Sequence, residues 1–244
     1  MRRCMSAERP ETSGVRRFRF RFKETIATVL VERDETFKRV VELMLYAREK
    51  IEEKIHSDPF FLVTYYPYDC SEEIVERMCR ASKLAGVGPM AAVAGTIAGY
   101  AVENVEEPFV VVDNGGDIAL RTDRKILVGI YPTNLAFEIE PTEFLAICTS
   151  SGKIGHSVSF GYADAATVVA KDASVADAFA TALGNTIEKG DGKKEIEEKL
   201  EEFWRRAKDY VEGVLVVKDD ILAFAGDVPE LRKAKINPDV ITKG

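Results

Sequence analysis

The patterned part of the chain begins with the run RRFRFRF from Arg16 to Phe22, in which arginine and phenylalanine alternate from Arg17 on. A period of two is that of a β-strand with one face in water. We therefore predict paired strands over 15–23 and 25–32, the first of them at the edge of a sheet. The alternative interpretation of the arginine row is a site for a polyanion. Residues 1–14 carry no such pattern and are expected to form a flexible tail ahead of a single domain, 15–244.

Apolar residues recur with a helical period over 35–56, where Val40, Met44 and Ile51 share one side. Further helices are predicted from Ser71 to the break at Gly86, and over 90–102, 174–188 and 193–210. Short apolar runs predict a buried strand over 60–67 and strands over 108–113, 118–121, 125–131, 144–149, 165–171, 213–218 and 221–225. Helices and strands are mixed without a regular βαβ rhythm. The expected fold class is therefore α+β, with mixed antiparallel sheets and packed helices, and not a dinucleotide-binding Rossmann unit.

Composition narrows the possible classes of function. Of 244 residues, 46% are hydrophobic and 31% are charged, which is typical of a globular protein with a substantial core. A net charge of −7 argues against a general nucleic-acid surface. No apolar stretch has the length of a membrane span, and the N-terminus lacks the apolar centre of a signal peptide. A cytoplasmic protein that binds neither nucleic acid nor membrane is expected.

The cysteines show neither a CxxC pair nor the spacing of a zinc site, and reduced thiols are expected at Cys4, Cys70, Cys79 and Cys148. Gln is absent while Glu and Lys are plentiful, a composition that resembles that of a thermophile protein. The helix predicted over 90–102 is built of Ala, Gly and Val, so it permits close approach of a ligand or neighbour and is compatible with a homo-oligomer. None of these features defines an activity, which must be sought in three local stretches.

The first stretch, Val110–Leu120, reads VVVDNGGDIAL. An apolar strand runs into Asn-Gly-Gly and a second strand leaves, and Asn-Gly favours a tight hairpin because both central residues need positive φ. Two features go beyond a plain hairpin. Gly115 and Gly116 leave bare backbone that a ligand can approach, and Asp113 and Asp117 add carboxylates that a hairpin does not need.

The second stretch, Cys148–Ser157, reads CTSSGKIGHS, so that a strand ends in hydroxyl groups, glycine and lysine. Such N–H and O–H donors beside a cation suit an anion, although the spacing is not that of a P-loop. Ser150 and Lys153 also fit the S-x-x-K pattern of serine acyl-transfer enzymes, but the companion S-D-N and K-T-G motifs are absent. His156, one of two histidines, is either a surface residue or part of a site here.

The third stretch, Ala173–Gly184, reads ASVADAFATALG and is almost entirely made of small residues. Ser174 is a candidate N-cap, and Asp177 three positions later can complete a capping-box-like pair. That interpretation leaves Thr181 unexplained. Positions four apart lie on one helix face, so the oxygens of Asp177 and Thr181 can converge. Hard oxygen ligands suit Mg²⁺, with carbonyls, waters or a diphosphate completing its six ligands.

In this order, the stretches resemble the ApbE-like superfamily, best known for FAD:protein FMN transferases. The matching segments are GYAVE at Gly99–Glu103, NGGDI at Asn114–Ile118, TSSG at Thr149–Gly152 and ADAFAT at Ala176–Thr181. The resemblance extends over about residues 88–184, and TVVAKDASVADAFATAL is its most specific part. The chain is similar in particular to a shorter branch found in anaerobic archaea and bacteria, some members of which are linked to homocysteine synthesis from sulfide.

The resemblance implies an ApbE-like fold with FAD or a related nucleotide held against Mg²⁺. The family's metal ligands correspond to Asp177, Thr181 and the carbonyls of Ala180 and Gly95. In that family a threonine hydroxyl of an acceptor protein attacks the phosphorus that bears FMN, and AMP is released. The residues expected along the nucleotide are Gly99, Asn114, Gly115, Gly116, Asp117, Ser150, Ser151, Gly152 and Lys153, with Asp177 and His156 expected to be catalytic.

The chain also departs from the family pattern. The lysine that precedes GYAVD in the family is Ala98 here, and the H-x-x-D-P-x-T-G loop is missing, although His156 remains and Asp164 either replaces part of that loop or ends a turn. Two interpretations follow. One is an Mg-dependent FMN transferase or FAD pyrophosphatase, and the other is a non-catalytic accessory or regulatory protein of sulfur metabolism. A serine acyl-transfer enzyme built on Ser150 and Lys153 is a third.

Overall fold

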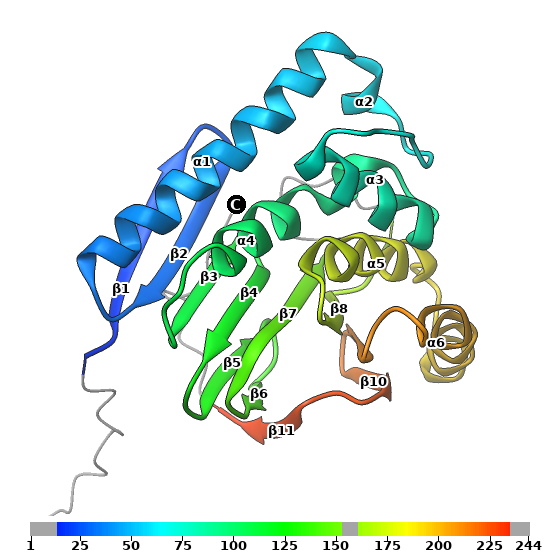
Figure 1. Ribbon diagram of the computed structural model, residues 1–244. Coiled ribbons are helices and arrows are strands. Elements are labelled where there is room, and N and C mark those ends of the chain that lie inside the picture. The colour runs from blue at the N-terminus through cyan, green and yellow to red at the C-terminus, as the bar shows by residue number, and fades with distance from the viewer. Residues whose placement is uncertain (1–13, 153–160, 235–244) are drawn as a thin grey trace, which may run out of the picture.

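The computed structural model describes residues 14–152 and 161–234, which form two antiparallel sheets and a layer of helices (Figure 1). The larger sheet has the strand order β1 (Arg16–Phe22), β2 (Thr25–Val31), β3 (Val110–Asn114), β4 (Asp117–Thr122), β7 (Thr142–Ser150), β8 (Ala165–Ala170), β9 (Gly213–Lys218) and β10 (Ile221–Gly226). The smaller sheet has the order β11 (Glu230–Lys233), β6 (Leu135–Ile139) and β5 (Ile126–Ile130). All of these neighbouring strands are antiparallel, and the expected α+β class is confirmed.

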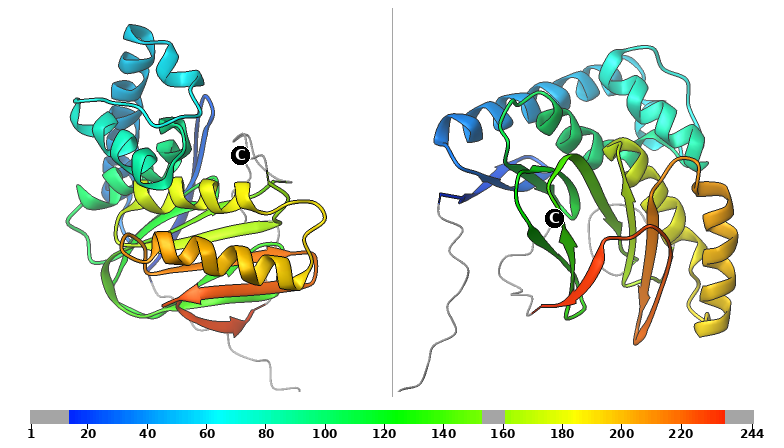
Figure 2. Two further views of the ribbon diagram at one scale, coloured as in Figure 1. Left: turned by 90° about the vertical axis from the view of Figure 1, so that its right-hand side faces the viewer. Right: turned by 60° about the horizontal axis from the view of Figure 1, so that its bottom comes forward.

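The helices cover one face of the larger sheet, and the smaller sheet covers the other face (Figure 2). They are α1 (Asp34–Ser57), α2 (Phe60–Val63), α3 (Glu73–Ala85), the 3₁₀ turn η1 (Pro89–Ala92), α4 (Val93–Glu103), α5 (Ala173–Thr186) and α6 (Lys193–Ala207). No single helix within 14–152 and 161–234 is long and apolar enough to cross a membrane. Only α3 taken together with Pro89–Glu103, bent by 105° between them, has the necessary length and composition.

Each face of the larger sheet has its own core, because successive side chains of a strand point to opposite faces. In β3, Val110 and Val112 pack under the helices, whereas Val111 packs against the smaller sheet. The central strands β8 and β9 are buried at every position. Both are therefore almost entirely apolar in sequence, whereas the edge strand β1 shows the alternation that predicted it.

Most of the predicted elements are present, with boundaries shifted by a few residues. The hairpin β1–β2 and the edge position of β1 are confirmed, and Phe18 of β1 stacks on Phe37 of α1 with ring centroids 4.3 Å apart. The helix expected over 90–102 begins with η1, because Pro89 and the glycine before it make a tight first turn. The short strands β6 and β11 were not predicted.

The prediction of a buried strand over 60–67 is wrong. Phe60–Val63 form the single-turn helix α2, and a loop follows it. Phe61 is buried, but Phe60, Leu62 and Val63 are exposed, and Tyr66 is 78% exposed. A short apolar run without alternation does not distinguish a strand from a helix, and here Pro59 with φ near −61° starts the turn.

The prediction of reduced thiols is wrong for two cysteines. Cys70 and Cys79 form a disulfide, with Cα atoms 6.0 Å apart, which joins the segment before α3 to the middle of that helix. A separation of nine residues matches no common cysteine motif, so the spacing carried no signal. Cys148 is a free, buried thiol, and Cys4 lies outside the described residues.

Candidate functional site

The site is built around a close contact between α4 and α5. A methyl group added at Gly95 would collide with the carbonyl of Ala173 and come within 2.7 Å of Asp177 Cβ. One added at Gly99 would lie 2.8 Å from the Ala173 side chain. Glycine at these two positions of α4 therefore lets the helices approach backbone to backbone, which explains why both helices are so rich in small residues.

Asp177 points from α5 to the start of α4. Its Oδ2 accepts a hydrogen bond of 2.8 Å from the N–H of Gly95, and the residue is only 7% exposed. Gly95 lies in the first turn of α4, where free N–H groups and the helix dipole favour a carboxylate. The contribution of Gly95 that the structure shows is thus its N–H, which fixes the orientation of the Asp177 carboxylate.

The expected capping arrangement of α5 is wrong. Asp172, not Ser174, is the N-cap, and its Oδ1 accepts from the N–H groups of Ser174 and Val175 at 2.9 and 3.2 Å. The helix begins one residue earlier than predicted, so Asp177 is too far along it to take part in the cap. Ser174 Oγ instead accepts from Thr96 Oγ1 of α4 at 2.8 Å, which adds a buried polar link between the two helices.

The β3–β4 hairpin lies against the first turn of α4. Gly115 and Gly116 have φ of +74° and +107°, and Asn114 pairs with Asp117 across them, so the predicted tight turn is confirmed. The N–H of Gly116 donates to Asp113 Oδ1 at 2.9 Å. Asn114 Nδ2 donates to the carbonyl of Ala94 at 3.1 Å, which ties the hairpin to the first turn of α4.

The end of β7 completes the same cluster. Asp117 Oδ1 accepts from the N–H of Thr149 at 3.2 Å, and Cys148, opposite Asp117 in the sheet, lies with Sγ 3.7 Å from the carbonyl of Ala173. The antiparallel register of β4 and β7 therefore brings the hairpin beside the strand end, and the contact of Cys148 with Ala173 brings α5 to the same place, although these segments are far apart in the sequence.

Burial dominates the electrostatics of this cluster. It raises the pKa of Asp177 well above its usual range, and the negative charge of Asp117 adds to the shift while the Gly95 N–H opposes it. Burial likewise raises the pKa of Asp117 to about 7, with the Thr149 N–H opposing the shift and Asp113 adding to it. The pKa of the Cys148 thiol is raised by burial and then by both carboxylates. No lysine or arginine of the described ranges is among the groups that shift these pKa values.

The two side chains expected to bind a metal, Asp177 and Thr181, offer only oxygen donors. Thr181 is half-buried one turn beyond Asp177, and Ala180 is fully buried inside α5, where a carbonyl normally serves the helix's own hydrogen bonds. Within residues 14–152 and 161–234, no three His, Cys, Asp or Glu side chains are arranged to hold a metal ion. A cation at Asp177 would therefore draw on hydroxyl, carbonyl, water or ligand oxygens, as Mg²⁺ does.

The other predicted residues fall into three groups. Ser150, Ser151 and Gly152 lie at the end of β7, half-buried or exposed, and the Gly152 N–H donates to the Ala163 carbonyl at 3.0 Å. Gly99 lies in the α4–α5 contact, one turn along α4 from Gly95. Lys153 and His156 lie outside the described residues.

Asp164, considered as a replacement for the missing loop, is held at the start of β8. Its Oδ2 accepts from the N–H of Asp219 at 2.6 Å, and its own N–H donates to the Val217 carbonyl at 2.8 Å. These contacts tie it to the β9–β10 turn, which favours the turn-ending interpretation.

Sequence reasoning missed two residues of the cluster. Asp172 directly precedes α5, and an Asp in that position is a common N-cap signal that was available. Cys148 could be placed only from the strand register, because nothing in the local pattern sets it opposite Asp117.

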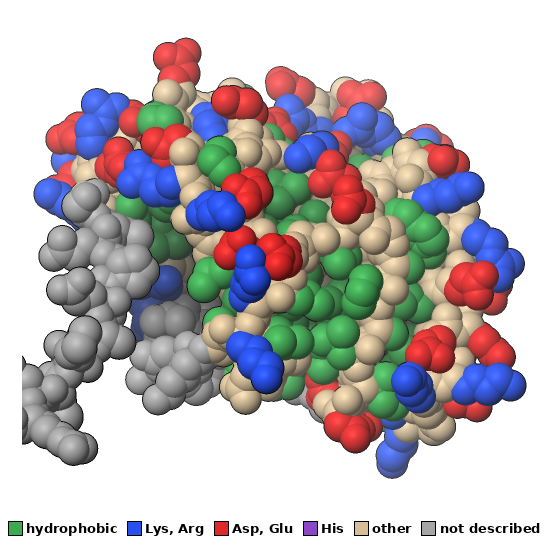
Figure 3. Space-filling model, turned by 90° about the horizontal axis from the view of Figure 1, so that it is seen from below, with side chains coloured by type: hydrophobic (Ala, Val, Ile, Leu, Met, Phe, Trp, Pro, Cys, Tyr) green, Lys and Arg blue, Asp and Glu red, His purple; other side chains and the backbone are tan. Residues whose placement is uncertain are grey.

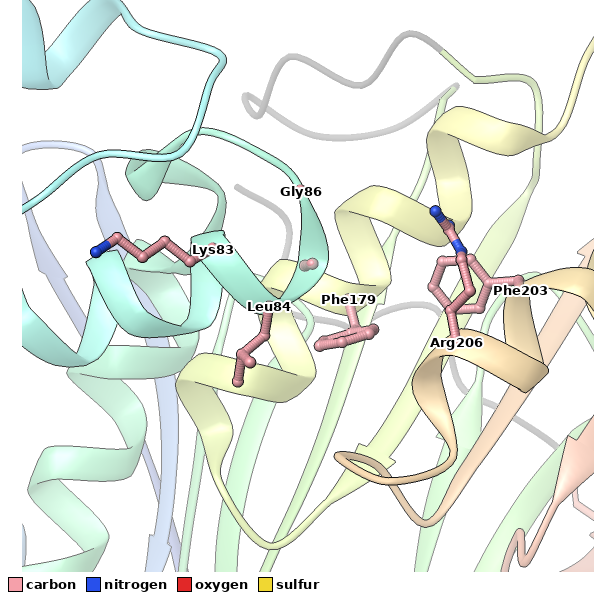
Figure 4. Close-up of a pocket in the computed structure, with 7 residues that line it drawn as sticks. Lys83, Leu84, Gly86, Phe179, Phe203 and Arg206 are labelled. Atoms are coloured by element: carbon pink, nitrogen blue, oxygen red, sulfur yellow. The ribbon is translucent and has the colours of Figure 1, made fainter.

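A separate pocket lies on the other side of α5, between α3 and α6, with a volume of about 120 Å³ (Figure 4). Its wall includes Leu84 and Gly86 of the α3 end, Phe179 of α5, and Phe203 and Arg206 of α6. Phe179 is two residues from Asp177, a rotation of about 200° around a helix, so this pocket faces away from the carboxylate cluster.

The protein has an α+β fold of two antiparallel sheets. A glycine-rich helix, a Gly-Gly hairpin and a Ser/Thr strand end surround an aspartate of an alanine-rich helix. This combination is the one expected of an ApbE-like protein. The chain belongs to this family: the family model described as AbpE bacteria matches residues 7–218. The UPF0280 protein of Archaeoglobus fulgidus is 59% identical over 235 residues, which cover 94% of this chain and 100% of that protein.

Two solved structures share the fold. The flavinyl transferase ApbE of Pseudomonas stutzeri, in its apo form, superimposes with a TM-score of 0.58 at 11% identity, covering 87% of this chain and 94% of that chain. The ApbE protein of Thermotoga maritima superimposes with a TM-score of 0.59 at 11% identity, covering 94% and 100%. At this level of identity the similarity establishes the fold.

Proposed function

We propose that this protein binds FAD or a related nucleotide diphosphate together with Mg²⁺ at the Asp117–Asp177 cluster, and that it transfers FMN to an acceptor protein or hydrolyses FAD. The main supporting observation is that the Asp117 and Asp177 carboxylates accept hydrogen bonds from backbone N–H groups, of Thr149 and Gly95, and that the charge of Asp117 raises the pKa of Asp177. Buried charge is normally paired or bound to a metal, so a cation suits this position. Structural relatives named flavin transferases support the choice of a flavin nucleotide.

Each part of the cluster would have its own role in binding. Asp177, oriented by the Gly95 N–H, and Thr181 would hold the cation, and the open backbone at Gly115–Gly116 would lie along the nucleotide. When bound, Mg²⁺ would supply Lewis-acid polarisation of the diphosphate. The hydroxyl and N–H groups of Ser150–Gly152 would bind phosphate oxygens at the open end of β7.

A second candidate function is a non-catalytic accessory or regulatory protein of sulfur metabolism, including homocysteine synthesis. The observation that favours it is Ala98, which is fully buried in α4 at the position where the family has a lysine. That site supplies no cation to balance a diphosphate. In this alternative the same cluster would bind a small anionic ligand and cation without turnover.

The test incubates the purified full chain with FAD and Mg²⁺ and separates FAD, FMN and AMP by chromatography, beside a thermal-shift series with FAD and Mg²⁺ singly and together. We expect a joint increase in melting temperature and release of AMP, both lost in Asp177→Asn. Asp209→Asn, an exposed aspartate beyond α6, is the matched control and should behave as wild type.

Three outcomes separate the candidates. AMP release that depends on Asp177 supports the enzyme. The accessory role is supported by two results together. The protein binds the nucleotide without turnover, and cells that lack the protein require homocysteine unless they receive wild type or Asp177→Asn. Absence of both binding and turnover contradicts a nucleotide site altogether.

A further inference from the structure

The segment that joins α2 to α3 lies against the residues that lead into α4. Thr64, at the start of this segment, is buried, and its carbonyl lies so close to Gly88 that a methyl group added there would collide with it. Gly88 immediately precedes η1, which continues into α4, and both α2 and α3 pack on η1. The position of this segment therefore affects the first turn of α4, where the Gly95 N–H holds the Asp177 carboxylate.

The other end of this segment is held by a covalent bond and by side-chain contacts. Cys70 is joined to Cys79 in the middle of α3 by the disulfide. The Tyr68 hydroxyl donates to Asp58 Oδ2 at 2.7 Å, and Asp69 forms an exposed ion pair with a lysine of α3. An exposed ion pair contributes little to stability. Breaking the disulfide would therefore leave the segment with side-chain contacts alone.

Both oxidation states of this cysteine pair are compatible with the fold. Cys79 is 2% exposed among apolar neighbours, where a free thiol behaves as a small hydrophobic side chain. Cys70 is half-buried, and its Sγ lies 3.5 Å from the carbonyl of Val75, which can accept from the thiol once the bond is broken. The two cysteines are only nine positions apart, so opening the bond frees a local segment and leaves the two cores intact.

We propose that the Cys70–Cys79 disulfide is a redox switch for the site at Asp177, and that the oxidised form binds the nucleotide and Mg²⁺ more tightly. The proposal rests on the proposed function of that site. In the oxidised form the disulfide keeps residues 64–70 against Gly88 and so fixes the start of α4. In the reduced form the segment moves away from Gly88, and the Gly95 N–H orients the Asp177 carboxylate less firmly.

The reductant is a dithiol, which reaches the half-buried Cys70 more easily than the buried Cys79. One thiolate of the dithiol attacks Cys70 Sγ, the disulfide bond breaks, and the sulfur of Cys79 leaves with the electron pair and takes up a proton. The second thiol of the reductant then displaces Cys70, which is released as a thiol. Two electrons and two protons pass to the protein, and the reductant becomes a disulfide.

The test compares the oxidised full chain with the chain reduced by dithiothreitol, using hydrogen exchange and mass spectrometry of the peptide that carries the disulfide. Reduction should make the amides of 64–72 and 88–95 exchange at least about tenfold faster. Strands β5 and β6 are the internal reference and should not change. They lie at the opposite end of the molecule, towards the face where hydrophobic side chains gather within a charged border (Figure 3).

Two variants separate the disulfide from its surroundings. Cys70→Ser should exchange like reduced wild type and should not respond to dithiothreitol. Asp69→Asn is the matched control, because it loses the neighbouring ion pair but keeps the disulfide, and it should respond as wild type does. Circular dichroism should show that both variants and the reduced wild type are folded.

The affinity for FAD with Mg²⁺ is measured on the same samples. We expect about tenfold weaker binding in reduced wild type and in Cys70→Ser. A protein that binds no nucleotide in either state contradicts the proposed function, and the exchange at 88–95 then still decides whether the bond controls the start of α4. Equal affinity in the two states, unchanged exchange at 88–95 on reduction, global unfolding on reduction, or failure of the disulfide to form under oxidising conditions would each overturn the switch.

Discussion

At the scale of single residues, Asp117 gives the protein a pH-dependent stability. Its pKa of about 7 in the folded state lies above the value of about 3.9 in an unfolded chain, so between those values the folded state holds the extra proton. Its contribution is therefore fully present below about pH 4 and is lost as the pH rises to about 7. The slope is at most about 1.4 kcal/mol per pH unit.

Urea unfolding in metal-free buffer at about pH 5 and about pH 8 checks this prediction. Wild type should lose more stability between the two pH values than Asp117→Asn, which has no proton to lose at this position. An equal loss in the two proteins would show that Asp117 titrates normally.

Gly95 is predicted to be intolerant of even one methyl group. Gly95→Ala would force α4 away from the Ala173 carbonyl, at a cost of about 1–3 kcal/mol, and would displace the Asp177 carboxylate that the Gly95 N–H holds. Gly190→Ala is the control, because nothing lies within 4 Å of a methyl group there. Urea unfolding of both variants should show a loss for Gly95→Ala alone, and similar midpoints would contradict the tight contact.

At the scale of elements, the start of α5 depends on Asp172. Removing its two hydrogen bonds to backbone N–H groups in Asp172→Ala should cost about 1 kcal/mol, a typical value for an N-cap. Asp209→Ala, outside any helix and exposed, should cost almost nothing. Thermal unfolding of the two variants measures the difference. If Asp172→Ala were neutral, Ser174 would again be the better candidate for the cap.

The elements that the sequence predicts well are those whose pattern is set by one buried face. Val40, Met44 and Ile51 define α1 because the helix covers the sheet on one side only, and the arginines of β1 mark its wet face. The segment 60–67 was mispredicted because a short apolar run without alternation is common to strands and helices, and in the structure its first four residues form a helical turn that packs on η1 and α1. The strand β11 is four residues long and pairs with β6 from almost a hundred positions away, so no local pattern identifies it.

The same distinction applies to the site. Glycines at 115 and 116 and the aspartate of α5 were found from the sequence, since turn chemistry and helical spacing are local. That Asp177 accepts a hydrogen bond from the Gly95 N–H, and that the charge of Asp117 raises the pKa of Asp177, depends on how α4 and α5 pack on the sheet. Such contacts follow from tertiary packing and register, which a single sequence does not specify.

At the scale of the whole molecule, the cluster joins segments from across the chain: α4, the β3–β4 hairpin, the end of β7 and α5. A ligand that binds there contacts all of them and should therefore stabilise the global fold. At about one hundred times its dissociation constant the gain is about 2.7 kcal/mol. We predict that FAD with Mg²⁺ slows hydrogen exchange in these four segments together, in wild type but not in Asp177→Asn. Protection confined to the pocket at Phe179 and Phe203, which faces away from Asp177, would place the ligand on the wrong side of α5 and contradict the proposed site.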